Sequence, residues 1–464
     1  MQCLFDIMMK IWEKDLRNFR LGEMRFNMKL DNDMSVSKID YASIKDTYAC
    51  PCDESKMYDK FLMPVKSKGM WVWFDGEEEP YLDLVLNYSS VNFGHCYPPI
   101  VKIVKEVIER VDQIHSFHSK DKLELSEYLS KKVSRDKNYK VYFNIGGSAA
   151  VSDAIRLCRH TTGKKYMISF DGSFHGVSSA AASVADDRLV AKEQYGIPIS
   201  DYTFSVPFPG KHNNVTISDC LKKIEKLISE NDIAGIIVEP IQGAGGFIIP
   251  KDSFLLELSN LCKRCEVKLI IDEIQVGFGR AGSFFVYQQY GVENPDIVLL
   301  SKSIAGGYFP VSAVIARSEL FDNVPNRGTA FQTTFNNSSL GLGIANQLMK
   351  LVEKEKIFDS IIEKGQVFLE KLSFLSKSPY VANLRGLGLA IAFDIIDPLS
   401  KLPSDKLAKI FVSQCLEEHV ISYACGVNFN SVKIIPSLVV TNEEIDIITE
   451  RLGKCLQRFH DSVK

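Results

Sequence analysis

Strand-like and helix-like segments alternate through the middle of the chain, and this order constrains the fold more than any other feature. Helical periodicity covers 123–135, 149–160, 221–231 and 254–265. Short runs rich in apolar and β-branched residues lie between or after them, at 140–145, 165–170, 234–240, 267–273 and 295–302. Such alternation is typical of an α/β domain with a mostly parallel sheet. The last three runs lack an apolar–polar alternation, which indicates central strands covered on both faces.

The pattern changes near residue 340. Two long helical stretches over 341–375 precede the apolar segment 384–396, two short strand-like runs and a final helix that Thr441 and Glu444 begin as a capping box. We therefore expect a second, smaller α+β domain. The expected parts are an extension of unassigned role over 1–45, the N-terminal part of the small domain over 46–94, a large domain over 95–335 and the rest of the small domain over 336–464.

Composition excludes several classes of protein. The 464 residues carry 55 Lys and Arg against 58 Asp and Glu, a net charge of −3, which argues against a general nucleic-acid binder. No apolar run reaches 18 residues, so no membrane-spanning helix is expected. The start of the chain fits neither a secretory signal nor a transit peptide, because Glu13 and Asp15 interrupt it. These features predict a cytoplasmic protein.

The cysteines show no framework or metal-site spacing. Eleven cysteines, an odd number, are expected to be reduced thiols. Cys262 and Cys265 form a CxxC pair within a predicted helix, but no second pair or suitably spaced histidines accompany it, and Cys50 and Cys52 are equally unsupported. We expect no metal site.

Three successive apolar runs end in ionisable residues: Glu239, Asp272 and Lys302. Ligands of open α/β sheets bind beyond the carboxyl ends of the strands. A desolvated lysine there loses its proton readily and attacks carbonyl groups, and a buried carboxylate can pair with the ring nitrogen of pyridoxal phosphate. The alternative is a surface lysine and a carboxylate that caps a turn.

Two glycine-rich segments are candidates for phosphate binding. The turn Gly146-Gly147-Ser148 lies between a strand and a helix, where free N–H groups favour an anion, although a plain turn with a serine cap would look the same. Gly277–Gly282 matches GxGxxG, the signature of a nicotinamide-dependent oxidoreductase. Residues 272–276 separate it from the strand, however, and that spacing disfavours a dinucleotide site.

These segments together resemble the class III aminotransferases, pyridoxal-phosphate enzymes of fold type I. The resemblance covers roughly residues 70–450. It is carried by YLDLVLNYSSVNFGHCYP, GGSAAVSDAIRLCR, FDGSFHG, VEPIQGAGG, IIDEIQVGFGRAGSFF and LLSKSIAGGYFP. It implies a large α/β domain that binds the cofactor and a smaller α+β domain.

The resemblance also implies roles for individual residues. Lys302 would form a Schiff base with pyridoxal phosphate and carry the proton, and Asp272 would bind the pyridine nitrogen. The remaining implied cofactor contacts are Gly147, Ser148, Phe174, His175, Glu239 and Gln275. Thr334, in QTTFNN, would touch the phosphate in a partner subunit's site, which implies a homodimer with shared sites.

The implied reaction moves an amino group from an amine or amino acid to an oxo-acid or aldehyde by a ping-pong mechanism. Tyr88 would line the substrate pocket, and Arg385 resembles a position near a substrate carboxylate, with a structural arginine as the alternative. Val177 and Lys433 stand where many relatives carry arginine. These departures leave the acceptor open and allow a racemase, epimerase or aminomutase on the same scaffold.

Overall fold

The computed structural model describes residues 60, 62–110, 117–135, 138–190, 202–322, 324, 331 and 333–464. The chain divides into two units, Met1–Ser55 and Lys56–Lys464. The expected extension over 1–45, together with Cys50 and Cys52, lies outside the described residues. Every described helix and strand belongs to the second unit.

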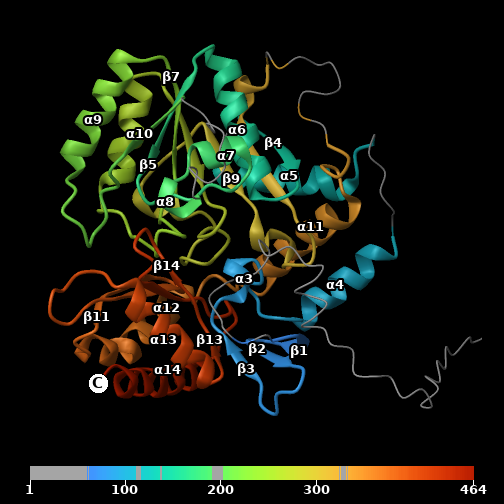
Figure 1. Cartoon of the computed structure of the whole chain (residues 1–464). Coiled ribbons are helices and arrows are strands. Elements are labelled where there is room, and N and C mark those ends of the chain that lie inside the picture. Colours follow the sequence, from blue (N-terminus) through green and yellow to red (C-terminus); the bar gives the residue numbers. More distant parts are fainter. Residues whose placement is uncertain are drawn as a thin grey trace, which may run out of the picture. The chain divides into compact units, whose positions relative to one another are not determined.

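A seven-stranded sheet forms the centre of the large α/β region (Figure 1). Its strands, in spatial order, are β4 (Tyr139–Asn144), β10 (Ser312–Arg317), β9 (Ile297–Leu300), β8 (Lys268–Asp272), β7 (Ile233–Val238), β5 (Tyr166–Phe170) and β6 (Thr203–Val206). β10 runs antiparallel to both neighbours, and every other neighbouring pair is parallel. The expected α/β fold with a mostly parallel sheet is confirmed.

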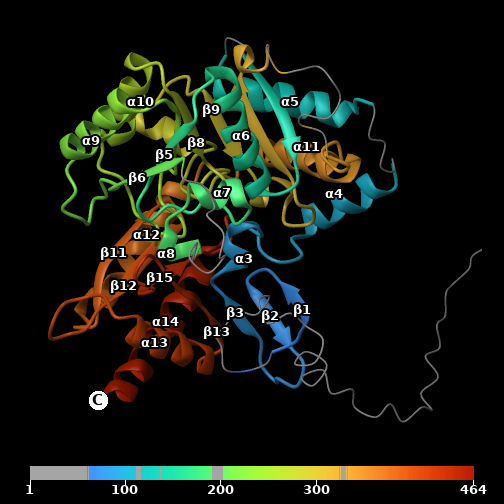
Figure 2. The same cartoon turned by 45° about the horizontal axis from the view of Figure 1, so that its top comes forward.

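Helices cover both faces of this sheet, as the views in Figures 1 and 2 show. Ile270 and Leu299 belong to one buried cluster with residues of α6 (Gly147–Thr162). Their neighbours Ile271 and Val298 belong to another, with α10 (Phe254–Arg264) and α9 (Ile217–Glu230). Because successive strand residues point to opposite faces, both sets must be apolar, which explains the missing alternation.

Two smaller sheets are built from the ends of the second unit, and one of them combines strands from both ends. One has the order β1 (Pro64–Lys68), β2 (Trp71–Phe74), β3 (Tyr81–Asp83) and β13 (Val420–Ile421), and the other β11 (Val381–Leu387), β12 (Ala390–Ile395), β15 (Ser431–Ile434) and β14 (Ala424–Cys425). The helices of this region are α12 (Ile361–Lys371), α13 (Asp405–Glu417) and α14 (Asn442–Val463). The capping box of Thr441 and Glu444 at the start of α14 is confirmed.

Two contacts bear on the expected division into domains. β13 pairs in parallel with β3, so the N-terminal and C-terminal segments of the expected small domain share a sheet. α11 (Ser339–Lys354), however, packs against α4 (Pro98–Ile108) and α5 (Lys120–Val133) of the expected large domain. Asn346 on α11 donates to Asp121 Oδ1 on α5 at 2.8 Å. The boundary at 336 stays a prediction.

Short elements complete the described fold. They are α3 (Leu86–Ser89), α7 (Ser179–Ser183), α8 (Asp187–Val190) and the 3-10 helices η3 (Val286–Tyr290), η4 (Lys302–Ala305), η5 (Ser318–Leu320) and η6 (Leu372–Lys377). Throughout the described ranges, no helix combines the length and apolar character needed to cross a membrane.

Candidate active site

The carboxyl ends of β7, β8 and β9 open into a cavity of about 170 Å³. Its lining residues are Gly147, Ser148, Phe174, His175, Gly176, Glu239, Asp272, Ile274, Gln275 and Lys302. The structure therefore brings together the cofactor-binding residues expected from the sequence, with the exception of Thr334. Gly176 and Ile274 were not among the expected site residues. Gly176 lies in FDGSFHG and Ile274 in IIDEIQVGFGRAGSFF, and a Cβ on Gly147 would come within 3.1 Å of the Ile274 side chain.

Lys302 is separated from the end of β9 by Ser301 and begins η4 with a φ of +48°. A non-glycine residue in this left-handed region is strained, and such strain is concentrated at functional sites. Burial lowers the pKa of the Lys302 ammonium to about 7, and the positive charge of Lys433 adds to this effect. A lysine with that pKa is substantially neutral at physiological pH and is a competent nucleophile.

Asp272 ends β8 and is held by two donors. Its Oδ1 accepts the backbone N–H of Ile274 at 3.0 Å, and its Oδ2 lies 2.7 Å from His175 Nδ1. Both side chains are buried, and His175 Nε2 is a buried atom without a hydrogen-bond partner. The orientation of the Asp272 carboxylate is therefore fixed, and Nε2 of His175 stays unpaired.

Glu239 follows β7 and ties two loops together. Its Oε1 accepts the N–H of Phe174 at 2.9 Å, and its Oε2 accepts the N–H of Gly243 at 2.8 Å. Burial raises the pKa of Glu239 to about 7, although His175 and the two N–H donors oppose the shift. The position of the Phe174 ring thus depends on a carboxyl group at the neighbouring strand end.

The turn before α6 is shaped to receive an anion. Gly146 has a φ of +79° and no side chain caps the first turn of α6. Ser148 Oγ accepts the N–H of Val177 at 3.1 Å. A Cβ on Gly176 would lie only 2.2 Å from Ser148 Oγ, so the close approach requires glycine there. Uncapped N–H groups at a helix start favour phosphate.

Gln275 lies between the cavity and the N-terminal segment. Its Nε2 donates to the backbone oxygen of Tyr88 at 3.2 Å. A Cβ on Gly243 would lie 1.9 Å from Gln275 Oε1, so only glycine fits beside this amide. Sequence reasoning missed the contribution of the Tyr88 carbonyl, because a backbone group leaves no mark in the residue types.

Two of the expected substrate residues, Lys433 and Tyr88, both contact Tyr423, and neither is part of the cavity lining. Lys433 on β15 is buried and its Nζ donates to Gly243 O at 3.1 Å. The same Nζ lies 4.8 Å from the ring centroid of Phe247 and 4.9 Å from that of Tyr423. Tyr88 packs edge-on against Tyr423 at 5.1 Å and is 42% exposed. Burial lowers the pKa of Lys433.

Arg385 is held by backbone and carboxylate groups. Its Nη2 donates to Gly246 O at 2.6 Å and to Asp394 Oδ1 at 2.9 Å, and its Nε donates to Gly246 O at 3.0 Å. The side chain is buried and is not part of the cavity lining. This geometry favours the structural alternative, and a contact with substrate stays a prediction.

Thr334 lies in an exposed turn and does not line the cavity. Its neighbour Thr333 donates to Asn144 Oδ1 at 3.4 Å, next to the end of β4. The expected contact of Thr334 with a partner subunit's phosphate stays a prediction.

The GxGxxG segment has a different role from the one its pattern suggests. Gly277–Gly282 forms turns that lead to no α-helix. A Cβ on Gly279 would lie 2.3 Å from the Phe358 ring, and one on Gly282 would lie 2.1 Å from the Ile362 side chain. These glycines allow close packing of the C-terminal region and do not begin a helix that could bind pyrophosphate.

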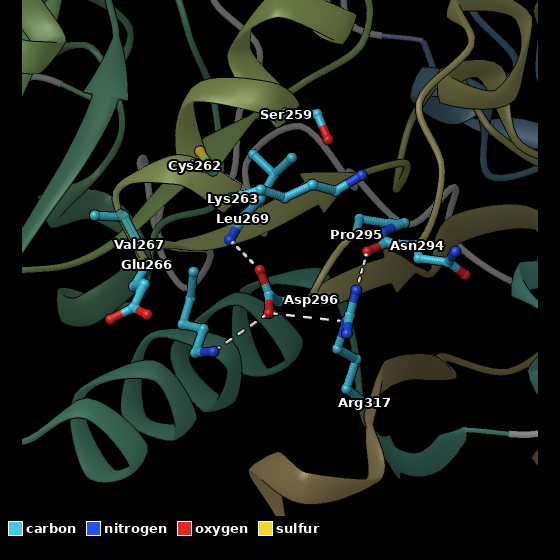
Figure 3. A pocket seen from close by; sticks show the side chains of 11 residues that line it. Ser259, Cys262, Lys263, Glu266, Val267, Leu269, Asn294, Pro295, Asp296 and Arg317 are labelled. Atoms are coloured by element: carbon cyan, nitrogen blue, oxygen red, sulfur yellow. Dashed lines mark hydrogen bonds and ion pairs between the residues drawn. The ribbon is translucent and has the colours of Figure 1, made fainter.

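A second hollow, of about 410 Å³, lies at the amino ends of β8 and β9 (Figure 3). Its centre is Asp296, which accepts the N–H of Leu269 at 2.9 Å and faces Lys268 Nζ at 3.5 Å and Arg317 Nε at 3.9 Å. It contains none of the expected site residues and lies at the opposite edge of the sheet from Lys302. Within the described residues, no group of three or more His, Cys, Asp or Glu side chains is placed to hold a metal ion.

Comparisons with known proteins agree with this geometry. The model of the family "Aminotransferase class-III" matches residues 54–456. The acetylornithine aminotransferase of Methanosarcina acetivorans is 31% identical over 393 residues, which cover 84% of this chain and 91% of that protein. The 4-aminobutyrate aminotransferase of Escherichia coli is 28% identical over 394 residues, covering 83% and 91%. The crystal structure of an (S)-enantioselective omega-transaminase from Thermomicrobium roseum superposes with a TM-score of 0.79 at 25% identity, over 86% of this chain and 93% of that one.

The fold and the site define an α/β enzyme with an activated lysine beside an anion-binding turn, Gly146–Ser148. The chain belongs to the class III aminotransferases, and it is a pyridoxal-phosphate-dependent aminotransferase. The cavity fits this cofactor. It offers a nucleophilic amine, a fixed carboxylate, an aromatic ring and uncapped helix N–H groups, and its glycines leave room that a Cβ would fill.

Proposed function

We propose that Lys302 is the residue that binds the cofactor covalently and moves the proton at the substrate's α-carbon. The observation that carries this proposal is that one cavity contains the Lys302 amine, the Asp272 carboxylate and the uncapped start of α6. A pKa of about 7 lets Lys302 accept and return a proton near neutral pH.

The other lining residues have supporting roles in this proposal. Pyridoxal phosphate supplies an electron sink when its ring nitrogen is protonated. Asp272, oriented by His175, would keep that nitrogen protonated. Gly147 and Ser148 would bind the phosphate, and Gln275 the phenolic oxygen. Phe174, fixed through Glu239, would pack against the ring face.

The substrates we propose are an amine or amino-acid donor and an oxo-acid or aldehyde acceptor, used in two half-reactions. The relatives named for acetylornithine and 4-aminobutyrate support amino-acid donors, since both names denote amino acids. Val177, whose N–H donates to Ser148 Oγ, carries no charge that could bind a substrate carboxylate. We therefore do not assign 2-oxoglutarate as the acceptor. No observation in the structure favours an isomerase, because Val177 and Lys433 bear on substrate binding and not on proton transfer.

We also propose a homodimer. Support for a second copy comes from the segment QTTFNN, which resembles the family's segment that reaches into the partner subunit's site. Thr334 precedes Phe335 and would contact the partner subunit's phosphate. A cytoplasmic location stays a prediction.

Reduction with borohydride, followed by peptide mapping of the holoenzyme, tests the covalent role. We expect the cofactor's mass on the peptide that contains Lys302. Lys302→Ala should abolish turnover and the added mass, whereas Lys226→Ala, at an exposed lysine of α9, should leave both unchanged. Turnover by Lys302→Ala at the wild-type rate would refute the assignment. A screen of amino acids, ω-amino acids and diamines, scored by conversion of bound cofactor to its pyridoxamine form, identifies the donor.

A further inference from the structure

The segment between β3 and α4 contains a left-handed turn that has no glycine. Leu86, Asn87, Tyr88 and Ser89 have φ values of +43°, +46°, +55° and +71°. L-amino acids disfavour this region, and they normally enter it as single residues. Four in succession persist only where the surrounding structure holds them, and strain of this kind is concentrated at functional sites.

The start of the turn is clamped by Asp83. Its Oδ1 accepts the N–H groups of Val85 at 2.8 Å and Leu86 at 3.0 Å. Its Oδ2 lies 2.9 Å from Nε2 of His95, which follows the turn. The carboxylate therefore closes the segment into a loop.

The far end of the turn is clamped by Asn92. Its Nδ2 donates to Ser303 Oγ at 2.9 Å, and its Oδ1 accepts from Arg280 Nη2 at 2.5 Å. Ser303 is the residue after Lys302, so the clamp is anchored beside the active-site lysine. The side chains of Asp83 and Asn92, both outside residues 86–89, thus fix the chain on either side of the turn.

The turn contacts the cavity lining through the backbone oxygen of Tyr88, which bonds to the lining residue Gln275. That oxygen accepts a hydrogen bond from Gln275 Nε2 at 3.2 Å. The opposite end of this amide, Oε1, faces Gly243, where a Cβ would lie 1.9 Å away. A flipped amide would place Oε1 against the Tyr88 oxygen, two acceptors in contact, so the carbonyl fixes which end of Gln275 carries the N–H groups.

We propose that the left-handed turn 86–89 is a positioning device for Gln275. It holds the Tyr88 carbonyl where that oxygen fixes the Gln275 amide and leaves the second N–H of Nε2 for the phenolic oxygen of pyridoxal phosphate. This inference rests on the proposed role of Gln275 as a cofactor ligand. The contact is made by a backbone oxygen, so it depends on the conformation of the turn and not on the Tyr88 side chain. Asn87 is the position at which that conformation can be changed.

The experiment changes the turn without removing a side-chain contact. Asn87 is exposed, and its backbone oxygen accepts from the N–H and Oγ of Ser90. Asn87→Val puts a β-branched residue into the left-handed region, which disfavours the turn, whereas Asn87→Gly adopts it without strain. Asn294, with a φ of +51° at the opposite edge of the sheet, is the matched control as Asn294→Val. Each variant is prepared as apoenzyme and titrated with pyridoxal 5′-phosphate, and the bound cofactor's absorbance maximum is recorded.

We expect Asn87→Val to weaken cofactor binding about tenfold, the effect of one lost hydrogen bond, and to shift the absorbance maximum. Asn87→Gly should keep the wild-type affinity. Asn294→Val should lower the melting temperature of the apoenzyme and leave affinity unchanged. In a Gln275→Ala background, Asn87→Val should have no further effect, because the amide it positions is gone.

The two proposals fail in distinguishable ways. If Gln275→Ala weakens binding but Asn87→Val weakens it equally in both backgrounds, the positioning inference is overturned and the role of Gln275 stands. If Gln275→Ala leaves affinity and absorbance unchanged, the role of Gln275 is refuted, and the inference with it.

Discussion

His175 Nδ1 and Asp272 Oδ2 lie 2.7 Å apart, both buried, although the residues are 97 positions apart in the sequence. Because Nδ1 faces a carboxylate oxygen, it is the nitrogen that carries a proton. The contact orients the group that we propose for the ring nitrogen of the cofactor. The histidine is thus a positioning residue for Asp272.

His175→Leu should weaken binding of pyridoxal 5′-phosphate to the apoenzyme roughly 10- to 100-fold, since a hydrogen bond to a charged group is worth about 1.5–3 kcal/mol. His175→Asn, whose Nδ2 can replace Nδ1 as a donor, should recover much of that loss. Fluorescence titration measures both affinities. Equal affinities for the Leu and Asn variants would show that the hydrogen bond has no part in cofactor binding.

From the burial of Glu273 we expect the free energy of unfolding to depend on pH. It is buried, its Oε1 accepts the N–H of Tyr287 at 2.8 Å, and its Oε2 has no partner. Burial raises the pKa of Glu273 from 4.5 to about 8. Between these two values the folded chain keeps a proton that the unfolded chain has lost, so the contribution of Glu273 to the free energy of unfolding falls as pH rises from about 4.5 to 8.

Glu273→Gln should remove that fall, because an amide stays neutral and keeps an acceptor for Tyr287. We expect the apoenzyme variant to exceed wild type in free energy of unfolding by on the order of 1–3 kcal/mol at pH 9, with little difference at pH 5. Urea unfolding at pH 5, 7 and 9 measures the effect. The exposed residue Glu266, changed to Gln, is the control and should not alter the profile. A constant difference between wild type and Glu273→Gln at all three pH values would contradict the prediction.

The sequence predicts the central sheet and the strand ends well, for a physical reason. Strands covered on both faces need uninterrupted apolar residues, so their ends are visible where Glu239, Asp272 and Lys302 appear. Parallel neighbours then place these ends at one edge of the sheet. The helix start at Ser148 follows from the same logic, since a strand–glycine–helix order leaves N–H groups free.

The rest depends on partners that local patterns do not encode. The role of Gly279 and Gly282 becomes clear only when Phe358 and Ile362 pack against them. The left-handed turn at 86–89 has no glycine to signal it, and Asn87 alone hints at a positive φ. Likewise, the helical pattern of α11 shows an apolar face but not that α5 covers it.

We expect removal of the Lys433 charge to shift the pH dependence of cofactor uptake. Its charge lowers the pKa of Lys302, and only the neutral Lys302 amine can react. Lys433→Met fills the space between Phe247 and Tyr423 without a charge, so the rate of cofactor uptake by the apoenzyme should reach its midpoint at a higher pH. Lys433→Arg keeps the charge and should keep the midpoint. Stopped-flow absorbance between pH 5.5 and 9.5 measures these profiles, and a shift of the Met variant to lower pH would refute the electrostatic role.

Variants of Arg385 distinguish a structural role of this residue from a role in substrate binding. Its Nη2 donates to Asp394 Oδ1 and its side chain is almost fully buried, so Arg385→Met leaves a carboxylate without its cation. We expect this variant to lose roughly 2–5 kcal/mol of unfolding free energy, and Asp394→Asn to recover part of the loss in the double variant. In Arg385→Lys, KM for each amine and carbonyl substrate should stay within about twofold of wild type, because the side chain does not line the cavity, although the loss of the planar fork lowers stability. Urea unfolding and initial-rate kinetics measure the two effects. A KM raised many-fold in Arg385→Lys, with unchanged stability, would assign Arg385 to substrate binding instead.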